Sequence, residues 1–199
     1  MIRNLILFVL ILVVNFTSAN AQKKVFILTE SKTDTIHQRF QSILILGAGS
    51  TVTRVFLDRL SEELIKKLNS EKINSEYYYL GKDIDTLSET FISITKKDYD
   101  AILIFNPDDT ARFKSTSKER RNVITLPSTG VEYTLIGKTT SIKTSYHQSF
   151  NLNLYSYEDK SKSLWEANLI VDFNMGRLSN YQKISNKIYW RLKANNYIK

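Results

Sequence analysis

The sequence has no cysteine and only two histidines, six glycines and two prolines among its 199 residues. Without cysteine the chain has no disulfide framework, no zinc–thiolate or iron–sulfur site, no thiol nucleophile and no acylated lipoprotein cysteine. Collagen-like and strongly disordered classes are also excluded, because glycine and proline are scarce and 42% of the residues are hydrophobic. An ordinary globular protein remains.

The first 21 residues form a predicted secretory signal peptide. Arg3 precedes ten consecutive apolar residues, 5–14, and Ala19 and Ala21 form a small-residue cleavage site. A membrane-spanning helix needs about 20 apolar residues, so the run is too short for a permanent anchor. We therefore expect cleavage near Ala21 and one exported globular domain, residues 22–199. An uncleaved short anchor is the alternative.

The positive net charge, the absence of disulfides and the position of the single glycosylation sequon favour a bacterial source. The chain carries a net charge of +8, and loss of Arg3 with the signal peptide leaves +7. A secreted eukaryotic domain of this size more often uses disulfides, and the single Asn-x-Thr sequon, 15–17, lies inside the signal peptide. We expect an exported protein of the periplasm or cell envelope that is soluble after cleavage.

The first half of the domain alternates between predicted strands and helices. Apolar runs at 24–30, 42–46, 75–80 and 101–105 predict strands, and the polar segment 31–41 predicts a loop or edge segment. An amphipathic helix is predicted over about 53–69, capped near Ser50 or Thr51, since apolar residues recur every fourth position at Val52, Phe56, Leu60, Leu64 and Leu68.

A second helix is predicted between the third and fourth strands. Thr86 and Glu89 have capping-box spacing, and the pattern ends at Lys96 and Lys97. Because single helices between strands give right-handed crossovers, the strands at 42–46, 75–80 and 101–105 should be parallel neighbours.

The second half predicts an antiparallel meander and a last helix. Alternating polar and apolar residues occupy 123–126, 131–142, 147–157 and 164–173, with a polar turn at 158–163. The last helix covers about 179–195. The fold class is therefore α/β with an α+β tendency: one mixed sheet, β-α-β-α-β followed by the meander and a C-terminal helix.

The turn at 47–54 is the first candidate site. Gly47 and Gly49 stand between a strand and a helix, where amides at a helix N-terminus could hold a phosphate, with Ser50, Thr51 and Arg54 beside them. Val52 replaces the third glycine of a dinucleotide-binding loop, and no P-loop lysine follows. Small residues in a tight strand-to-helix turn are the structural alternative.

Catalytic and metal-binding patterns are sparse. His37 and His147 lie in different segments without a second ligand at helical spacing, and no Gly-x-Ser-x-Gly elbow occurs. The acidic pairs, at 83 and 85, 98 and 100, and 108 and 109, fall at predicted element boundaries, which favours capping and turn formation over a carboxylate dyad. We expect no catalytic residue, no metal and no cofactor.

The segment 110–121 is the most basic part of the chain and the second candidate site. It holds five basic residues and one acid, Glu119, and we interpret it as a loop that could contact phosphate groups on lipid or lipopolysaccharide. The basic residues are Arg112, Lys114, Lys118, Arg120 and Arg121. A solvated loop without a ligand is the alternative. Because the protein is expected to be exported, we do not expect nucleic acid as a ligand of this segment.

Three segments carry a resemblance to a known group of domains: 44–47 with Arg54, Phe56 and Leu57; 98–103; and 188–198. With the order of elements, they resemble small bacterial envelope domains typified by the TolB amino-terminal domain, the curli-secretion lipoprotein CsgG and the peptidoglycan-synthase activator LpoB. The resemblance implies a non-enzymatic role in binding other envelope proteins. It does not extend to the lipobox cysteine of many of those proteins.

These observations favour an exported, non-catalytic accessory or binding protein that contacts an unidentified envelope protein. Two alternatives stay open. One is a ligand-binding or enzymatic domain for a phosphate-bearing molecule at the 47–54 turn, and the other is a peripheral binder of anionic membrane or lipopolysaccharide through 112–121. The oligomeric state is open.

Overall fold

The computed structural model describes residues 25–34, 39–82, 99–121, 124–125, 132–133 and 138–199. Several predictions from the sequence lie outside these ranges. They are the signal peptide, His37, the helix expected around 86–97, and the acidic residues at 83, 85 and 98.

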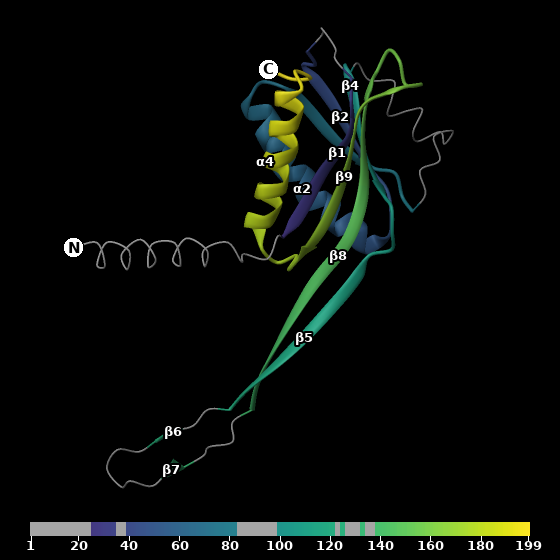
Figure 1. Ribbon diagram of the computed structural model, residues 1–199. Coiled ribbons are helices and arrows are strands. Elements are labelled where there is room, and N and C mark those ends of the chain that lie inside the picture. The colour runs from purple at the N-terminus through teal and green to yellow at the C-terminus, as the bar shows by residue number, and fades with distance from the viewer. Residues whose placement is uncertain (1–24, 35–38, 83–98, 122–123, 126–131, 134–137) are drawn as a thin grey trace, which may run out of the picture.

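The described residues form one mixed α/β fold with a seven-stranded sheet (Figure 1). Six strands lie in the order β1-β9-β8-β4-β2-β3, and β5 pairs with β8. The strands are β1 (Phe26–Thr33), β2 (Ser42–Gly47), β3 (Asn74–Tyr79), β4 (Ala101–Pro107), β5 (Arg112–Arg121), β8 (Lys138–Ser156) and β9 (Ser163–Phe173). Two short strands, β6 (Ile124–Thr125) and β7 (Glu132–Tyr133), pair with each other.

The predicted parallel centre of the sheet is confirmed. Strand β2 pairs in parallel with both β3 and β4, whereas β4 with β8, β8 with β9, and β9 with β1 are antiparallel. Strand β1 lies at an edge and continues to Thr33, so part of the segment predicted as a loop or edge is strand.

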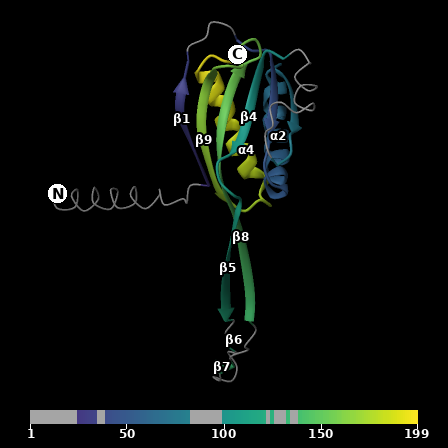
Figure 2. The same cartoon turned by 90° about the vertical axis from the view of Figure 1, so that its right-hand side faces the viewer.

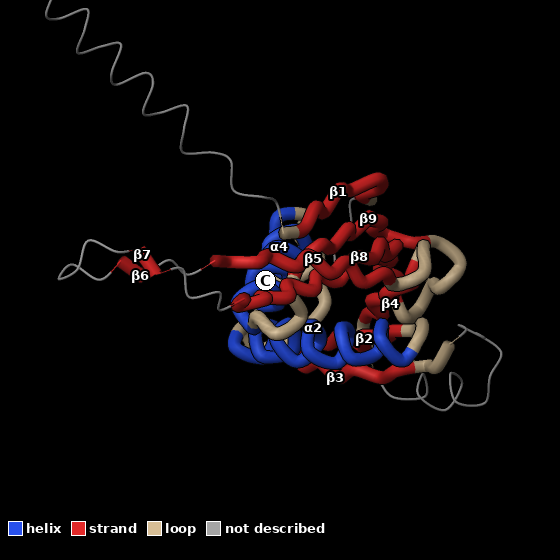
Figure 3. The backbone as a smooth tube through the Cα atoms, turned by 90° about the horizontal axis from the view of Figure 1, so that it is seen from below, coloured by secondary structure: helices blue, strands red, loops and turns tan. Residues whose placement is uncertain are grey.

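Both described helices cover the same face of the sheet (Figures 1 and 3). Helix α2 (Thr51–Ser70) begins after the N-cap Ser50, whose hydroxyl accepts a hydrogen bond from the Thr53 amide at 3.3 Å. This cap confirms the predicted helix start, because a Ser side chain satisfies one of the amides that a helix N-terminus leaves without a partner. Helix α4 (Leu178–Ala194) matches the predicted C-terminal helix.

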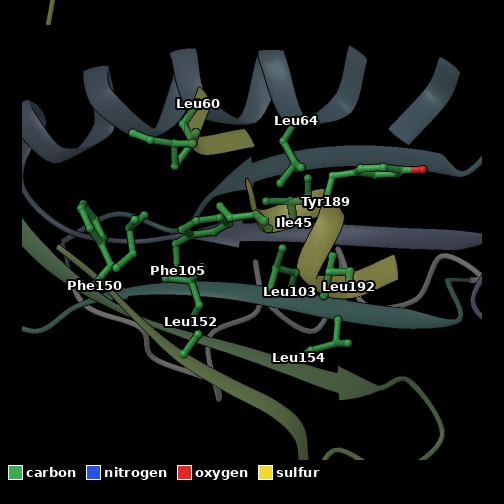
Figure 4. Close-up of a cluster of buried hydrophobic side chains, with 14 of the residues drawn as sticks. Ile45, Leu60, Leu64, Leu103, Phe105, Phe150, Leu152, Leu154, Tyr189 and Leu192 are labelled. Atoms are coloured by element: carbon green, nitrogen blue, oxygen red, sulfur yellow. The ribbon is translucent and has the colours of Figure 1, made fainter. Parts of the chain in front are cut away.

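The core lies between the helices and the sheet (Figure 4). Every second residue of β9 is buried, and three of its apolar residues pair with apolar residues of β8. These pairs are Phe150 with Leu169, Leu152 with Ala167, and Leu154 with Trp165. Phe56 of α2 stacks on Tyr146 and Phe150 at centroid distances of 5.3 and 5.2 Å. Alternation along the strands thus places one apolar face under the helices.

Two details of the predicted meander are wrong. The segment 112–121, expected in a loop, is strand β5. Residues 138–142 of the run expected at 131–142 and residues 147–156 of the run expected at 147–157 belong to a single strand, β8. Charged residues do not prevent strand formation where both faces of a ribbon are away from the core. For the same reason the segment lacks the apolar alternation that marks a buried strand.

Strands β5 and β8 continue past the sheet as a two-stranded ribbon. The last pair of β8 with β9 is Tyr146 with Phe173. From there to the pair Arg121 with Lys138, eight residue pairs join β8 to β5 alone. Figures 1 and 2 show the ribbon projecting from the body of the fold. Among the described residues, no helix combines the length and apolarity needed to cross a bilayer.

Candidate functional sites

The two glycines of the 47–54 turn have packing roles. A Cβ on Gly47 would lie 2.7 Å from Leu57 Cδ1 and 3.1 Å from the Tyr77 hydroxyl. Gly49 has φ of +135°, and a Cβ there would lie 2.7 Å from Thr53 Cγ2. Only glycine avoids both the backbone strain and the steric contact at this position. The glycines therefore let helix α2 approach the end of strand β2.

Four amides of the turn have hydrogen-bond partners inside the protein. The Ala48 amide donates to the Phe105 carbonyl at 3.4 Å, and the Gly49 amide donates to the Gly81 carbonyl at 2.8 Å. The Thr53 amide donates to the Ser50 hydroxyl, and the Arg54 amide donates to the Ser50 carbonyl at 2.9 Å. A phosphate bound by any of these four amides would have to compete with the hydrogen bond described for it.

The Arg54 side chain is also engaged. Its Nε lies 3.6 Å from Asp58 Oδ2, and its guanidinium carbon lies 5.3 Å from the centre of the Tyr79 ring. The Tyr79 hydroxyl donates to the carbonyls of Gly49 and Ser50. The structure therefore brings Gly49, Ser50, Thr51 and Arg54 into one turn, and the contacts found there fit a structural connection. Anion binding at this turn stays a prediction.

A buried polar cluster links the start of α2 to strand β8. The Thr53 hydroxyl donates to Gln148 Oε1 at 3.1 Å, and the Tyr146 hydroxyl donates to the same oxygen. Gln148 Nε2 donates in turn to the Asp109 carbonyl at 2.9 Å. Burial raises the pKa of Tyr146 well above its usual value. Sequence reasoning missed Gln148, although it stands between Tyr146 and Phe150 on the buried face, where a polar residue needs a partner.

The described residues of the acidic pairs named from the sequence accept hydrogen bonds from backbone amides or from a side-chain amide. Asp100 Oδ2 accepts hydrogen bonds from the amides of Gln41 and Ser42 at 2.7 and 2.9 Å. Asp109 Oδ1 accepts one from the Ser149 amide at 2.8 Å. Asp108 Oδ1 accepts one from Asn151 Nδ2 at 3.2 Å. The contacts of Asp100 and Asp109 with backbone amides are of the capping kind that the sequence predicts.

An open polar depression of about 550 Å³ lies at the amino ends of the parallel strands. It is lined by Arg39, Gln41, Ser42, Lys72, Asn74 and Asp100. Asp100 is occupied by the two backbone hydrogen bonds described above. Ligands of parallel sheets bind beyond the opposite, carboxyl ends of the strands, so this depression is not favoured as a site.

The basic residues of 112–121 occupy one strand of the ribbon. The side chains of Arg112 and Lys114 are exposed, at the base of the ribbon. Lys118, Arg120 and Arg121 follow in β5, where their backbone positions pair with Ser141, Thr139 and Lys138 of β8. All five residues named from the sequence therefore lie along β5. An extended strand holds these residues at a regular spacing, which a loop would not do.

His147 is a half-buried residue of strand β8. It pairs with Arg112 on one side and with Asp172 on the other. Within the described residues, no group of three histidine, aspartate or glutamate side chains is arranged to hold a metal ion. Phe113, which follows Arg112 in β5, is 55% exposed, and its ring centre lies 5.9 Å from that of Tyr146.

No protein-family model and no curated protein matches this sequence. Among solved structures, the chain is structurally similar to a PelC dodecamer from Paraburkholderia phytofirmans, with 7% identity, a TM-score of 0.44, and coverage of 87% of this chain and 99% of that chain. A second crystal form, of a single-residue variant of that dodecamer, gives 5% identity and a TM-score of 0.41, covering 87% and 98% of the two chains.

A PDZ domain protein from Parabacteroides distasonis is similar at 10% identity with a TM-score of 0.33. The match covers 84% of this chain and 36% of that one. Identities of this size transfer no residue role to this chain. The resemblance to the TolB, CsgG and LpoB domains stays a prediction.

Proposed function

We propose that this protein is an exported, non-catalytic binding protein of the bacterial envelope, and that the β5–β8 ribbon is its contact with an anionic partner. Export rests on the leader at 1–21, and the absence of an enzymatic role rests on the lack of cysteine and the separation of the two histidines along the chain.

One observation carries the proposal: the ribbon extends eight residue pairs beyond the last pair of β8 with β9. A two-stranded ribbon without a third strand or a covering helix is marginally stable in water. Within the described part of the chain, no further strand pairs with these eight residue pairs. The extension adds little to the core of the fold, which supports a role in contacting another molecule.

The charge of the ribbon supports an anionic partner. Strand β5 contains five basic residues and one acid, Glu119. The side chains described at its base, Arg112 and Lys114, are exposed. Positive charge concentrated on a projecting element attracts anions before contact and orients the approach.

Photocrosslinking in cells tests the proposal. A photoreactive phenylalanine derivative replaces Ser115 or Thr144, which are exposed in the ribbon, and Asn186 or Lys187, which are exposed on α4, as matched controls. We expect adducts with an envelope component from the ribbon positions only. Equal adducts from α4, or none from a folded ribbon variant, would contradict the proposal.

Export has a test of its own. Mass spectrometry of the protein purified from cells should give a chain that begins at Gln22. An intact Met1 in protein recovered from the cytosol would contradict the predicted export, whatever the ribbon binds.

A further inference from the structure

The register of β5 and β8 gives the two faces of the ribbon different charge. Cross-strand partners share a face, and successive residues of a strand alternate between faces. One face, called here the cation face, has five basic positions: Arg112, Lys114, Lys118 and Arg120 of β5, and Lys143 of β8, which pairs with Thr116. Asp172 of β9 lies beside the Arg112 end of this face, because His147 pairs with both Arg112 and Asp172. The other face has the basic positions Arg121 and Lys138 and the acid Glu119.

The basic positions of the cation face form an extended line. Arg112 and Arg120 are eight residues apart on one strand, a distance of roughly 27 Å at about 3.4 Å per residue. Lys143 lies across from Thr116 and so fills the interval between Lys114 and Lys118. The backbone positions of neighbouring members of the line are therefore separated by about the screening length at physiological salt, roughly 8 Å. Their potentials overlap, and a surface that carries many negative charges complements such a line better than a single anion does.

The sequence between the two strands favours a bilayer over a soluble polyanion. Residues 122–137 contain one charged residue, Glu132, and seven apolar ones: Val123, Ile124, Leu126, Val131, Tyr133, Leu135 and Ile136. Where the structure describes this segment, Ile124 of β6 pairs with Tyr133 of β7. Interfacial membrane binding combines apolar contact with attraction to anionic lipids, whereas a soluble polyanion would use only the charges.

The position of the ribbon allows such contact. The eight pairs that project beyond the sheet extend roughly 25 Å at the rise of an antiparallel strand. Figures 1 and 2 show the helices packed on the body of the fold, away from the ribbon. A flat surface can therefore meet the ribbon without meeting α2 or α4.

We infer that the cation face docks on the surface of an anionic phospholipid bilayer. This inference rests on the proposed function and names its partner. Each basic side chain held at an anionic membrane surface contributes roughly a fivefold factor in binding. Five such positions give a strong preference for anionic over zwitterionic lipid, and the preference weakens as salt screens the charges.

Vesicle partitioning tests this inference with the protein purified from cells that express the full chain. The vesicles are pure phosphatidylcholine, or phosphatidylcholine with roughly a third phosphatidylglycerol. The test variant carries Arg112→Thr, Lys114→Thr, Lys118→Thr and Arg120→Thr, because Thr is compatible with a strand. The control removes the same number of charges from exposed positions elsewhere, with Lys82→Gln, Lys183→Gln, Lys187→Gln and Lys199→Gln. Circular dichroism shows whether each variant is folded.

We expect the wild type and the control to partition onto the anionic vesicles and the test variant to lose at least about thirtyfold in partitioning. An equal loss in both variants would mean that only the net charge matters, and would overturn the inference. A folded wild type that prefers neither lipid would overturn it too. The ribbon crosslinks would then still decide whether the proposed function holds with a protein or a polysaccharide as the partner.

Discussion

Replacement of Gly49 by Ala tests whether the 47–54 turn is a structural connection. Gly49 has φ of +135°, and a new Cβ would lie 2.7 Å from Thr53 Cγ2 and 2.9 Å from Thr53 Cβ. The backbone strain costs about 1–3 kcal/mol, and the steric contact costs about 1–3 kcal/mol more, since Thr53 is buried in the cluster with Gln148. We expect a total loss of about 3 kcal/mol.

Gly81→Ala separates the two contributions. Gly81 also has a positive φ, +99°, but a Cβ there would have no atom within 4 Å. The stability of this variant should therefore fall only by the cost of the backbone strain, about 1–2 kcal/mol. Combining Gly49→Ala with Thr53→Ser, which removes the nearest methyl group and keeps the hydroxyl, should recover part of the steric loss.

Thermal and urea denaturation measure these differences. A loss of about 3 kcal/mol corresponds to a fall of roughly 6–12 °C in Tm for a domain of this size. A Gly49→Ala variant as stable as the wild type would refute the structural explanation of the turn. If phosphate then stabilised the wild type and not the variant, the phosphate-binding alternative would gain support instead.

Three further predictions concern stability. Ser50→Ala removes the cap of α2 and should cost about 1 kcal/mol in urea denaturation; no change would mean that the cap is not used. Leu152→Ala, at a fully buried position, should cost about 2–5 kcal/mol; a loss below 1 kcal/mol would argue against the described core. Burial raises the pKa of Tyr146 above its unfolded value, so the stabilising contribution of this side chain should be constant below pH 10 and fall by about 1.4 kcal/mol per pH unit above it. The pKa values of Tyr77 and Tyr197 are also raised by burial and add to the fall. Tyr146→Phe should therefore reduce the slope by about 1.4 kcal/mol per pH unit, and an unchanged slope would contradict the prediction.

The sequence predicts the helices and the parallel strands well, because their apolar residues keep a clear period. Phe56, Leu60 and Leu64 recur at helical spacing and are buried on one face of α2. Ser50 marks the helix start, as its side chain is suited to an N-cap. Where one face of a helix or strand packs against the core, its apolar residues recur with the period of that element, and the sequence shows this period.

The ribbon has no such signal. Residues 112–121 consist of charged and hydroxyl side chains with one apolar residue, Phe113, so the segment lacks the alternation that predicts a buried strand and is predicted as a loop. Its strand conformation depends on pairing with residues 138–147, a contact across at least 16 intervening residues that local propensity does not encode. Gln148 was missed for a related reason, because its partners Thr53 and Asp109 are distant in the sequence.

Hydrogen exchange along β8 tests the central claim most directly, since one strand belongs partly to the sheet and partly to the ribbon. In the free protein, we expect the amides of 138–145 to exchange at least about tenfold faster than those of 146–156. On anionic vesicles the amides of 138–145 should slow by about tenfold, with those of α4 unchanged. Unchanged exchange in the ribbon, together with new protection on α2 or α4, would contradict the claim that this protein makes contact through its ribbon.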